Sequence, residues 1–326
     1  MLVVIASSFF GFATGQSGSA SRHYHQIDKI VLGGEGTWDY PELDPKNRLI
    51  YISHETAVEV VNIDTGKLVR RIAEIKGVHG IVAVPELDAI FVTEGKADRV
   101  SVFAPQSTAA RMRVETGKGP DAIVYDPATQ RVFTSNGDSA DMTAFDARSG
   151  KVLGTIALGG DPESITVNGK GLLWVAIADK NEVVNIDTRD LSVKRRIELP
   201  SCRTAKSIAV DDQHHRLFVG CRNKILAVIN TKTGGTVTSV PIGDRVDSTI
   251  FDPTTGMIFN SNGDGTITVI HEDSRDRFTV VETIKSLPGA KTMAFDPKTK
   301  RLFLPVRDVA PPTQTVGTFC LLVFGR

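Results

Sequence analysis

A short apolar segment that ends in an aromatic residue, followed by small polar residues, recurs along the whole chain. The aromatic residue returns every 40 to 44 positions, as Tyr51, Phe91, Phe133, Trp174, Phe218, Phe259 and Phe303. A fixed period of this size is typical of supersecondary units that are stacked or arranged around an axis. The pattern therefore predicts seven copies of one structural unit.

The third repeat shows most clearly what each unit contains. Its apolar segments cover 123–125, 131–134, 142–145 and 151–156, and each has the length of a β-strand. Asp126-Pro127 and the segment 146–150 separate them, with residue types that favour tight turns. No part of the chain shows sustained helical periodicity. Four short antiparallel strands in about forty residues form one blade of a β-propeller, so the chain is predicted to be all-β.

The last repeat has room for only three strands, at 291–295, 301–304 and 319–324. Near the other end of the chain, residues 27–34 repeat the pattern of the fourth strand at 152–160. The N-terminal strand is therefore predicted to complete the last blade and to close the ring, which removes an exposed sheet edge. The prediction is one seven-bladed β-propeller domain over residues 22–326, with four antiparallel strands per blade.

Charge and the N-terminal segment limit the choice of partner and location. The chain has 38 basic and 38 acidic residues, whereas nucleic acids attract proteins with a basic field, so a nucleic acid is not expected as a partner. Residues 1–12 form an apolar run that is too short to span a membrane, and small residues follow it. We interpret residues 1–21 as an export signal, with a disordered terminus as the alternative. An exported monomer without a transmembrane segment is expected.

The cysteines and one pair of histidines have predictable places in this fold. Cys202 precedes the first strand of blade five and Cys221 ends its second strand, so both lie at the same end of the blade. A disulfide between them is plausible, and two unrelated small side chains are the alternative. Cys320 is interpreted as a buried apolar residue of a strand. His214 and His215 fall in a turn at the opposite face and are interpreted as surface residues.

The ends of the second strands resemble a known motif. They read Tyr51-Ile-Ser-His54, Phe91-Val-Thr-Glu94, Phe133-Thr-Ser-Asn136 and Phe259-Asn-Ser-Asn262. These segments resemble the Tyr-Val-Thr-Asn tetrad of the YVTN family of bacterial β-propeller repeat proteins, although only those of blades three and six end in asparagine, and blades four, five and seven depart further from the tetrad. The resemblance implies a seven-bladed and usually exported propeller of the periplasm or cell surface. Some of the relatives that it suggests belong to quinone or haem dehydrogenase systems. It implies no catalytic residues.

One position just before the first strand is ionisable in every repeat, although only 23% of the chain is charged. Its occupants are Asp39, His79, Asp121, Glu163, Lys206, Asp247 and Lys291. In a propeller this position, and the loops that join strands two and three, surround one end of the central channel. The sequence therefore predicts a ring of charge at the mouth of the channel.

Two interpretations of this ring remain open. In the first, the mouth is merely solvated and its charges offset one another. In the second, it binds a ligand, most readily in the sector of blades one to three, which holds Asp39, His54, His79, Glu94, Asp121 and Asn136. Imidazole and carboxylate groups suit a divalent metal ion such as Zn²⁺. The predicted metal ligands are His54, His79, Glu94 and Asp121, and these groups could also act as acid and base.

Two functions follow from these patterns. The first is an exported scaffold whose polar channel mouth binds a protein, a small molecule or a cell-wall component. The second is a metal-dependent hydrolase or lyase, similar to a lactonase, with its site at the same mouth. The sequence contains no nucleophile elbow, no phosphate-binding glycine loop and no haem-attachment motif. The binding scaffold is therefore the first expectation.

Overall fold

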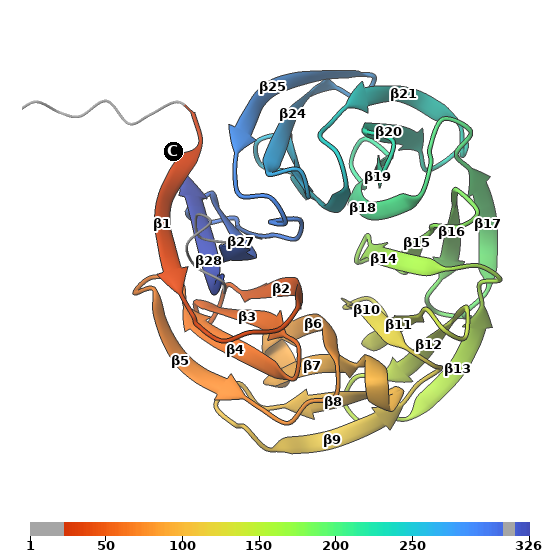
Figure 1. Ribbon diagram of the computed structural model, residues 1–326. Helices are drawn as coiled ribbons and strands as arrows, with labels where there is room; N and C mark the ends of the chain where they lie inside the picture. The colour runs from red at the N-terminus through yellow and green to blue at the C-terminus, as the bar shows by residue number, and fades with distance from the viewer. Residues whose placement is uncertain (1–22, 309–316) are drawn as a thin grey trace, which may run out of the picture.

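The computed structural model describes residues 23–308 and 317–326, and within them it forms seven four-stranded antiparallel sheets arranged in a ring (Figure 1). The predicted seven-bladed β-propeller is therefore confirmed. The predicted export signal at 1–21 lies outside the described residues. Within the part that is described, no helix is long and apolar enough to cross a membrane.

The blades follow one another along the chain, and we number them from the first complete sheet. Blades one to three are β2 (Trp38–Asp44), β3 (Leu49–His54), β4 (Ala57–Asn62) and β5 (Lys67–Ile72); β6 (Val78–Val84), β7 (Ala89–Glu94), β8 (Arg99–Phe103) and β9 (Ala110–Glu115); β10 (Pro120–Asp126), β11 (Arg131–Asn136), β12 (Asp141–Asp146) and β13 (Val152–Ala157). Two 3₁₀ turns, η1 (Pro85–Leu87) and η2 (Gly95–Ala97), interrupt the loops of blade two.

The remaining blades repeat this arrangement. They are β14 (Pro162–Val167), β15 (Leu172–Ile177), β16 (Glu182–Asp187) and β17 (Val193–Glu198); β18 (Ala205–Asp211), β19 (Arg216–Cys221), β20 (Ile225–Asn230) and β21 (Thr236–Pro241); β22 (Val246–Asp252), β23 (Met257–Asn262), β24 (Thr266–Ser274) and β25 (Arg277–Lys285); β26 (Ala294–Asp296), β27 (Arg301–Asp308), β28 (Thr318–Gly325) and β1 (His25–Val31). In each blade the first of these strands lies nearest the axis and the last lies at the rim (Figure 1).

The N-terminal strand closes the ring. β1 pairs antiparallel with β28, in a register that places His25 opposite Gly325 and Val31 opposite Cys320. Figure 1 shows β1, in red, at the outer edge of the blade that carries the C-terminal strands in blue. The predicted closure is confirmed, and it pairs an edge that would otherwise be free to join another sheet.

The apolar core lies between neighbouring blades, and the periodic aromatic residues stand in it. All seven of these aromatic residues are at most 2% exposed. Three of them contact an aromatic ring of the next blade. The centroid distances are 6.1 Å for Phe91 and Phe145, 5.3 Å for Phe218 and Phe251, and 5.3 Å for Phe259 and Phe295. The middle strands are covered on both faces, so an aromatic residue there packs each blade against the next.

The ring has two faces, which differ in the loops that they carry. We call the upper face the end where strand one begins and where strands two and three are joined. The lower face is the end where strands one and two are joined, and where strands three and four are joined.

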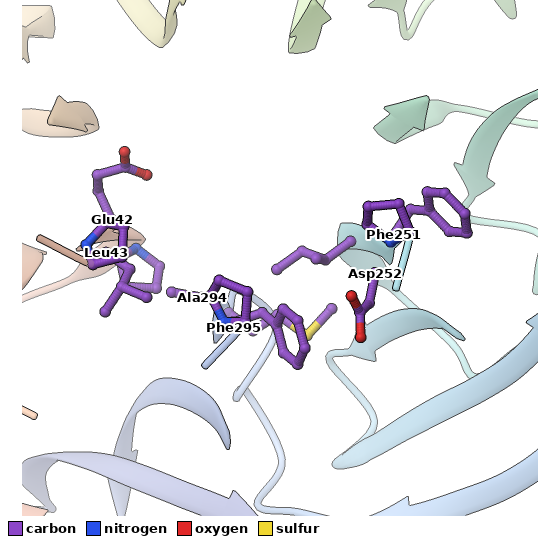
Figure 2. A pocket seen from close by; sticks show the side chains of 12 residues that line it. Glu42, Leu43, Phe251, Asp252, Ala294 and Phe295 are labelled. Carbon is purple, nitrogen blue, oxygen red and sulfur yellow. The ribbon is translucent and has the colours of Figure 1, made fainter. Parts of the chain in front are cut away.

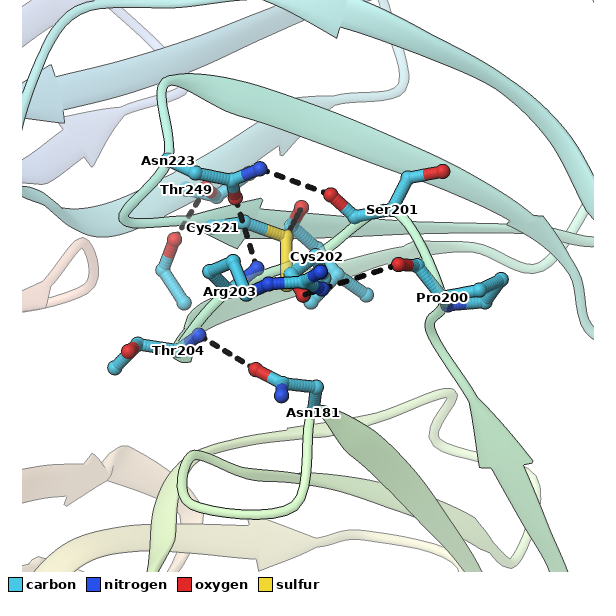
Figure 3. Close-up of a disulfide and its surroundings, with 11 residues drawn as sticks. Asn181, Pro200, Ser201, Cys202, Arg203, Thr204, Cys221, Asn223 and Thr249 are labelled. Carbon is cyan, nitrogen blue, oxygen red and sulfur yellow. Dashed lines mark hydrogen bonds between the residues drawn. A yellow bond between two sulfur atoms is a disulfide. The ribbon is translucent and has the colours of Figure 1, made fainter.

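A disulfide closes the upper loop of blade five (Figure 3). Cys202 and Cys221 are bonded, with their Cα atoms 5.4 Å apart. Asn223 ties the same loop together, because it donates to the carbonyl of Ser201 (2.9 Å) and accepts from the backbone N–H of Arg203 (2.8 Å). Cys320 is buried in β28 with a free thiol.

Candidate functional site

The first strands begin at the upper face, and three of them bring ionisable side chains together. His79 Nδ1 lies 3.1 Å from Asp39 Oδ2 and 3.7 Å from Asp121 Oδ1. One possible ligand atom from each residue lies within 4.8 Å of the other two. We call Asp39, His79 and Asp121 the mouth cluster, because these residues come from the innermost strands β2, β6 and β10.

Buried hydroxyl groups from the second strands hold the backbone of this ring in place. The hydroxyl of Thr93 donates to the carbonyl oxygen of Asp121 at 3.0 Å, and that of Ser135 donates to the carbonyl oxygen of Glu163 at 3.1 Å. Each hydroxyl therefore links its own blade to the ring residue of the next blade. This contact gives the third position of the recurring tetrad a structural role.

The ring divides into a paired part and an acidic part. Lys206 pairs with Glu163, and Lys291 pairs with Asp247, which also lies 3.2 Å from Arg222. In blades four to seven every carboxylate of the ring therefore faces a cation. In blades one to three, two carboxylates share one imidazole, so the mouth carries its excess of negative charge there.

The acidic part contains a buried acceptor without a hydrogen bond. Oδ1 of Asp121 is inaccessible to solvent and accepts no hydrogen bond within the described residues. Burial, with the charge of Asp39 adding to it, raises the pKa of Asp121 to about 7. The hydrogen bond to Asp39 raises the pKa of His79. Perturbed groups of this kind gather at functional sites more often than elsewhere.

Three residues of the predicted sector, His54, Glu94 and Asn136, are buried, and the contacts described for them lie away from the mouth cluster. The imidazole of His54 is buried, stacks on Phe319 at 4.0 Å and lies 3.1 Å from Glu59. Glu94 pairs with Arg99 at 3.0 Å.

Asn136 is also turned into its own blade. Its amide group donates to Asp141 at 2.7 Å and to Thr143 at 2.9 Å. These three residues end second strands, whose two faces are covered by neighbouring blades, so their side chains point into the ring wall. A ligand role for the ring residues themselves stays a prediction.

Below the mouth, the channel contains groups that the sequence did not single out. A cavity of about 130 Å³ is lined by Tyr40, Glu42, Gly80, Ala122 and Ser164, among others. Glu42 accepts from the N–H of Ala83 at 3.2 Å, and burial raises its pKa to about 8. At this register, opposite the periodic aromatic residue, other first strands carry Val82, Val124 and Ile250, so a carboxylate there is the signal that could have identified Glu42.

Glu42 also borders a larger pocket at the lower end of the channel. This pocket of about 450 Å³ lies between blades one, six and seven, and Figure 2 shows Glu42, Asp252, Phe251 and Phe295 around it. Its wall is mostly apolar and rich in proline. The short inner strand β26 contributes Ala294 and Phe295 to this wall.

The fold and the charged channel mouth define the class of protein as a seven-bladed β-propeller with a polar upper opening. No family model matches the chain. A chain in the crystal structure of the mitotic checkpoint complex is similar in fold, with a TM-score of 0.77 and 16% identity over 98% of this chain and 99% of that chain. At this identity the likeness shows the fold alone.

Among curated proteins, Antigen Lp49 of Leptospira interrogans is similar over a limited region. The two sequences are 26% identical over 113 residues, which cover 33% of this chain and 25% of the antigen. The match therefore spans about a quarter of the length of that relative.

Proposed function

We propose that this propeller is a binding scaffold whose mouth cluster receives a positively charged group, an ammonium or a guanidinium, of a small molecule or a protein partner. The observation that carries the proposal is the buried Oδ1 of Asp121, which accepts no hydrogen bond. An acceptor of this kind is costly to leave unpaired. Binding therefore requires the Asp121 carboxyl group, whose side chain is 31% exposed, to turn this oxygen toward a donor of the ligand.

The charge around the cluster favours an organic cation. Within the described residues, Asp39 and Asp121 form no ion pair with a lysine or an arginine. Lys206 and Lys291 lie further round the ring and pair with Glu163 and Asp247. The side chains of His79, Asp121 and Asp39 are 42%, 31% and 19% exposed, so a ligand can reach them from solvent. The protein complex that contains a similar propeller supports a role in binding by analogy only.

The same proposal includes export, and membership of the YVTN type of propeller. The apolar segment 1–12 and the Cys202–Cys221 disulfide support export, since disulfides persist mainly in oxidising compartments. A fusion of residues 1–21 to a phosphatase that is active only outside the cytoplasm tests this part. Activity in an intact cell would support export, and activity that needs lysis would count against it.

Isothermal titration with lysine amide and arginine amide tests binding at the mouth, and glutamate serves as the anionic comparison. We expect the two cations to bind and glutamate not to bind. In Asp121→Asn the affinity should fall by about tenfold or more, because a charge-assisted hydrogen bond is lost.

The matched controls change a similar pair outside the channel, His271 and Asp273, whose Nδ1 and Oδ1 atoms are 2.7 Å apart. Asp273→Asn and His271→Ala should bind like the unmodified protein. If neither cation binds, or if Asp121→Asn binds as tightly as the control, the mouth is a solvated opening and the proposal fails.

We do not favour the metal-dependent hydrolase or lyase. Of its four predicted metal ligands only His79 and Asp121 come together, whereas His54 and Glu94 are engaged inside their own blades.

A further inference from the structure

A second cluster of one histidine and two carboxylates lies at the lower face, between blades five and six. His214 Nδ1 is 2.8 Å from Asp211 Oδ2 and 3.2 Å from Glu272 Oε1. One possible ligand atom from each of these residues lies within 4.8 Å of the other two. We call Asp211, His214 and Glu272 the lower cluster.

In the equivalent turn of four other blades, the residue at the position of His214 donates a side-chain hydrogen bond to the aspartate that starts the turn. Five blades have the same lower turn, which starts with an aspartate that accepts from the backbone N–H two residues later. In four of them the fourth turn residue donates its side chain to that aspartate over 2.6 to 2.9 Å, namely Asn47, Thr129, Thr255 and Thr299. In blade five this residue is His214.

The residue of the following blade that lies next to the turn aspartate also differs in blade five. Asp126 receives the hydroxyl of Thr188 of blade four at 2.5 Å. Glu272 is the counterpart of Thr188 in blade six. Each residue follows the third-strand residue that pairs with the start of strand two, and its backbone N–H donates to the carbonyl of the glycine before that strand, Gly171 for Thr188 and Gly256 for Glu272. Asp211 therefore faces a second carboxylate where Asp126 faces a hydroxyl donor.

In two other blades the turn aspartate pairs with a cation of the following blade, but blade six has no cation at the equivalent position. Lys300 Nζ lies 2.8 Å from Asp252, and Arg48 Nη2 lies 2.8 Å from Asp296; both cations come from the left-handed turn residue of the following blade. The equivalent residue next to Asp211 is Gly256, which has a φ of 70° and no side chain. In the part of the chain that the structure describes, Asp211 and Glu272 thus form no ion pair with a lysine or an arginine, unlike Asp252 and Asp296.

The carboxylates of this cluster are buried and poorly satisfied. The side chain of Glu272 is 2% exposed, and neither of its oxygens accepts a hydrogen bond within the described residues. Burial and the charge of Asp211 raise the pKa of Glu272 to about 7. The His214 nitrogen is closer to Asp211, and a single N–H serves one acceptor well.

The nearby guanidinium of Arg216 does not neutralise this pair. Its nitrogens donate to the carbonyl oxygens of His214, His215 and Arg275, and one of them lies 2.6 Å from Asp276. Arg216 therefore holds the loop that carries His214. The imidazole itself is 43% exposed and borders a surface pocket of about 270 Å³, whose lining also includes Arg216, Lys232 and Arg275, so water can approach from that side.

From this geometry we infer that the lower cluster is a binding site for a divalent transition-metal ion, best represented by Zn²⁺, with Asp211, His214 and Glu272 as its protein ligands. One imidazole nitrogen and two carboxylate oxygens from three side chains suit such an ion, and water from the pocket fills the open coordination position. The ion supplies the positive charge that Lys300 and Arg48 supply elsewhere. The site therefore joins blades five and six.

The test is titration of the metal-free protein with Zn²⁺, and with Mg²⁺ for comparison, followed by calorimetry and thermal unfolding. We expect one tight Zn²⁺ site, a raised unfolding temperature with Zn²⁺ and a much smaller effect of Mg²⁺. His214→Ala and Glu272→Gln should each weaken Zn²⁺ binding by about tenfold or more. Visible absorption of bound Co²⁺ should be lost in the same variants.

Three further variants make the result unambiguous. Glu272→Thr copies the pair of blades three and four, so it should fold without metal yet lose the effect of Zn²⁺. His271→Ala removes an exposed histidine next to Glu272 that pairs with Asp273 instead, and it should bind Zn²⁺ normally. His79→Ala, at the mouth, should also retain this site. The inference is overturned if the unmodified protein shows no tight Zn²⁺ site, or if His214→Ala retains it.

Discussion

The propeller carries two clusters of one histidine and two carboxylates, at opposite ends and in different settings. The mouth cluster draws one residue from each of three first strands around the axis, and its side chains are 19% to 42% exposed. The lower cluster joins only two blades, and its carboxylates are 2% and 4% exposed under the lower turns. The same side-chain chemistry thus faces solvent in one place and is enclosed by protein in the other.

This difference determines what each cluster can hold. The partly exposed charges at the mouth are screened by water more than the enclosed ones, so they suit a loosely held organic cation. Enclosed carboxylates strongly favour a compact ion that touches all of them, because water cannot satisfy them. The ring at the mouth also carries Lys206 and Lys291 in its other blades, whereas the position next to Asp211 that would carry a cation is occupied by Gly256.

The largest expected effect on stability comes from the disulfide of blade five. The disulfide lies at the upper face of this blade and the lower cluster at its lower face, so removing it also tests whether the two ends are independent. The variant in which Cys202 and Cys221 are both serine should lose about 3 kcal/mol of unfolding free energy, as expected for a crosslink that closes a short loop. Urea unfolding measures this loss. Zn²⁺ binding at the lower face should remain; its loss would show that the two ends are not independent.

A smaller effect is expected from Glu272→Thr in the absence of metal. Replacing a buried, unpaired carboxylate with a hydroxyl donor should raise the unfolding free energy by about 1–2 kcal/mol. Urea unfolding of the metal-free protein at pH 8 measures the gain. Asp121→Asn, at the more exposed mouth, should gain less. An equal gain at both sites would remove the proposed difference in enclosure.

The pH dependence of stability should have the same sign at both clusters. The pKa values of Asp121 and Glu272 are raised to about 7, so the native state keeps protons that the unfolded chain has already lost. Stability should therefore fall as pH rises from about 4 to about 7, and then level off. His79, whose pKa is also raised, contributes a fall in the same direction.

Thermal unfolding of the metal-free protein between pH 4 and 8 measures this fall. Asp121→Asn and Glu272→Gln should each flatten the profile, whereas Asp273→Asn should not. A stability that rises through this range in the variants and the unmodified protein alike would contradict the assignment.

Salt should produce the smallest effect. Raising NaCl to about 0.5 M shortens the screening length to a few ångströms, so lysine amide binding at the mouth should weaken several-fold. Zn²⁺ binding at the lower cluster should change less, because its ligands are enclosed. Calorimetric titrations at two salt concentrations compare the two sites directly, and a stronger salt dependence at the lower face would reverse the comparison.

The fold was predictable because each blade repeats the same local information. Aromatic residues at a fixed period, aspartates at the lower turns and the strand-like segment near the N-terminus required no knowledge of distant contacts. The ring residues Asp39, His79 and Asp121 were predictable for the same reason, since rotation about the axis brings equivalent positions to one opening.

Only the tertiary structure decided which side chains join that ring. His54, Glu94 and Asn136 occur at a regular position too, but the neighbouring blades cover both faces of their strands, so these side chains are buried in the wall of the ring. Successive side chains of a strand point to opposite faces, and when both faces are buried this alternation does not show which residue reaches the channel.

The lower cluster was hidden from the sequence for a different reason. His214 was interpreted as a surface turn residue, which describes its place in the chain but omits Glu272, 58 positions later. The sequence alone determined the repeat, the number of blades and the closure of the ring, because these depend on local pattern. Which carboxylates are buried against each other depends on packing between blades, and only the assembled structure shows it.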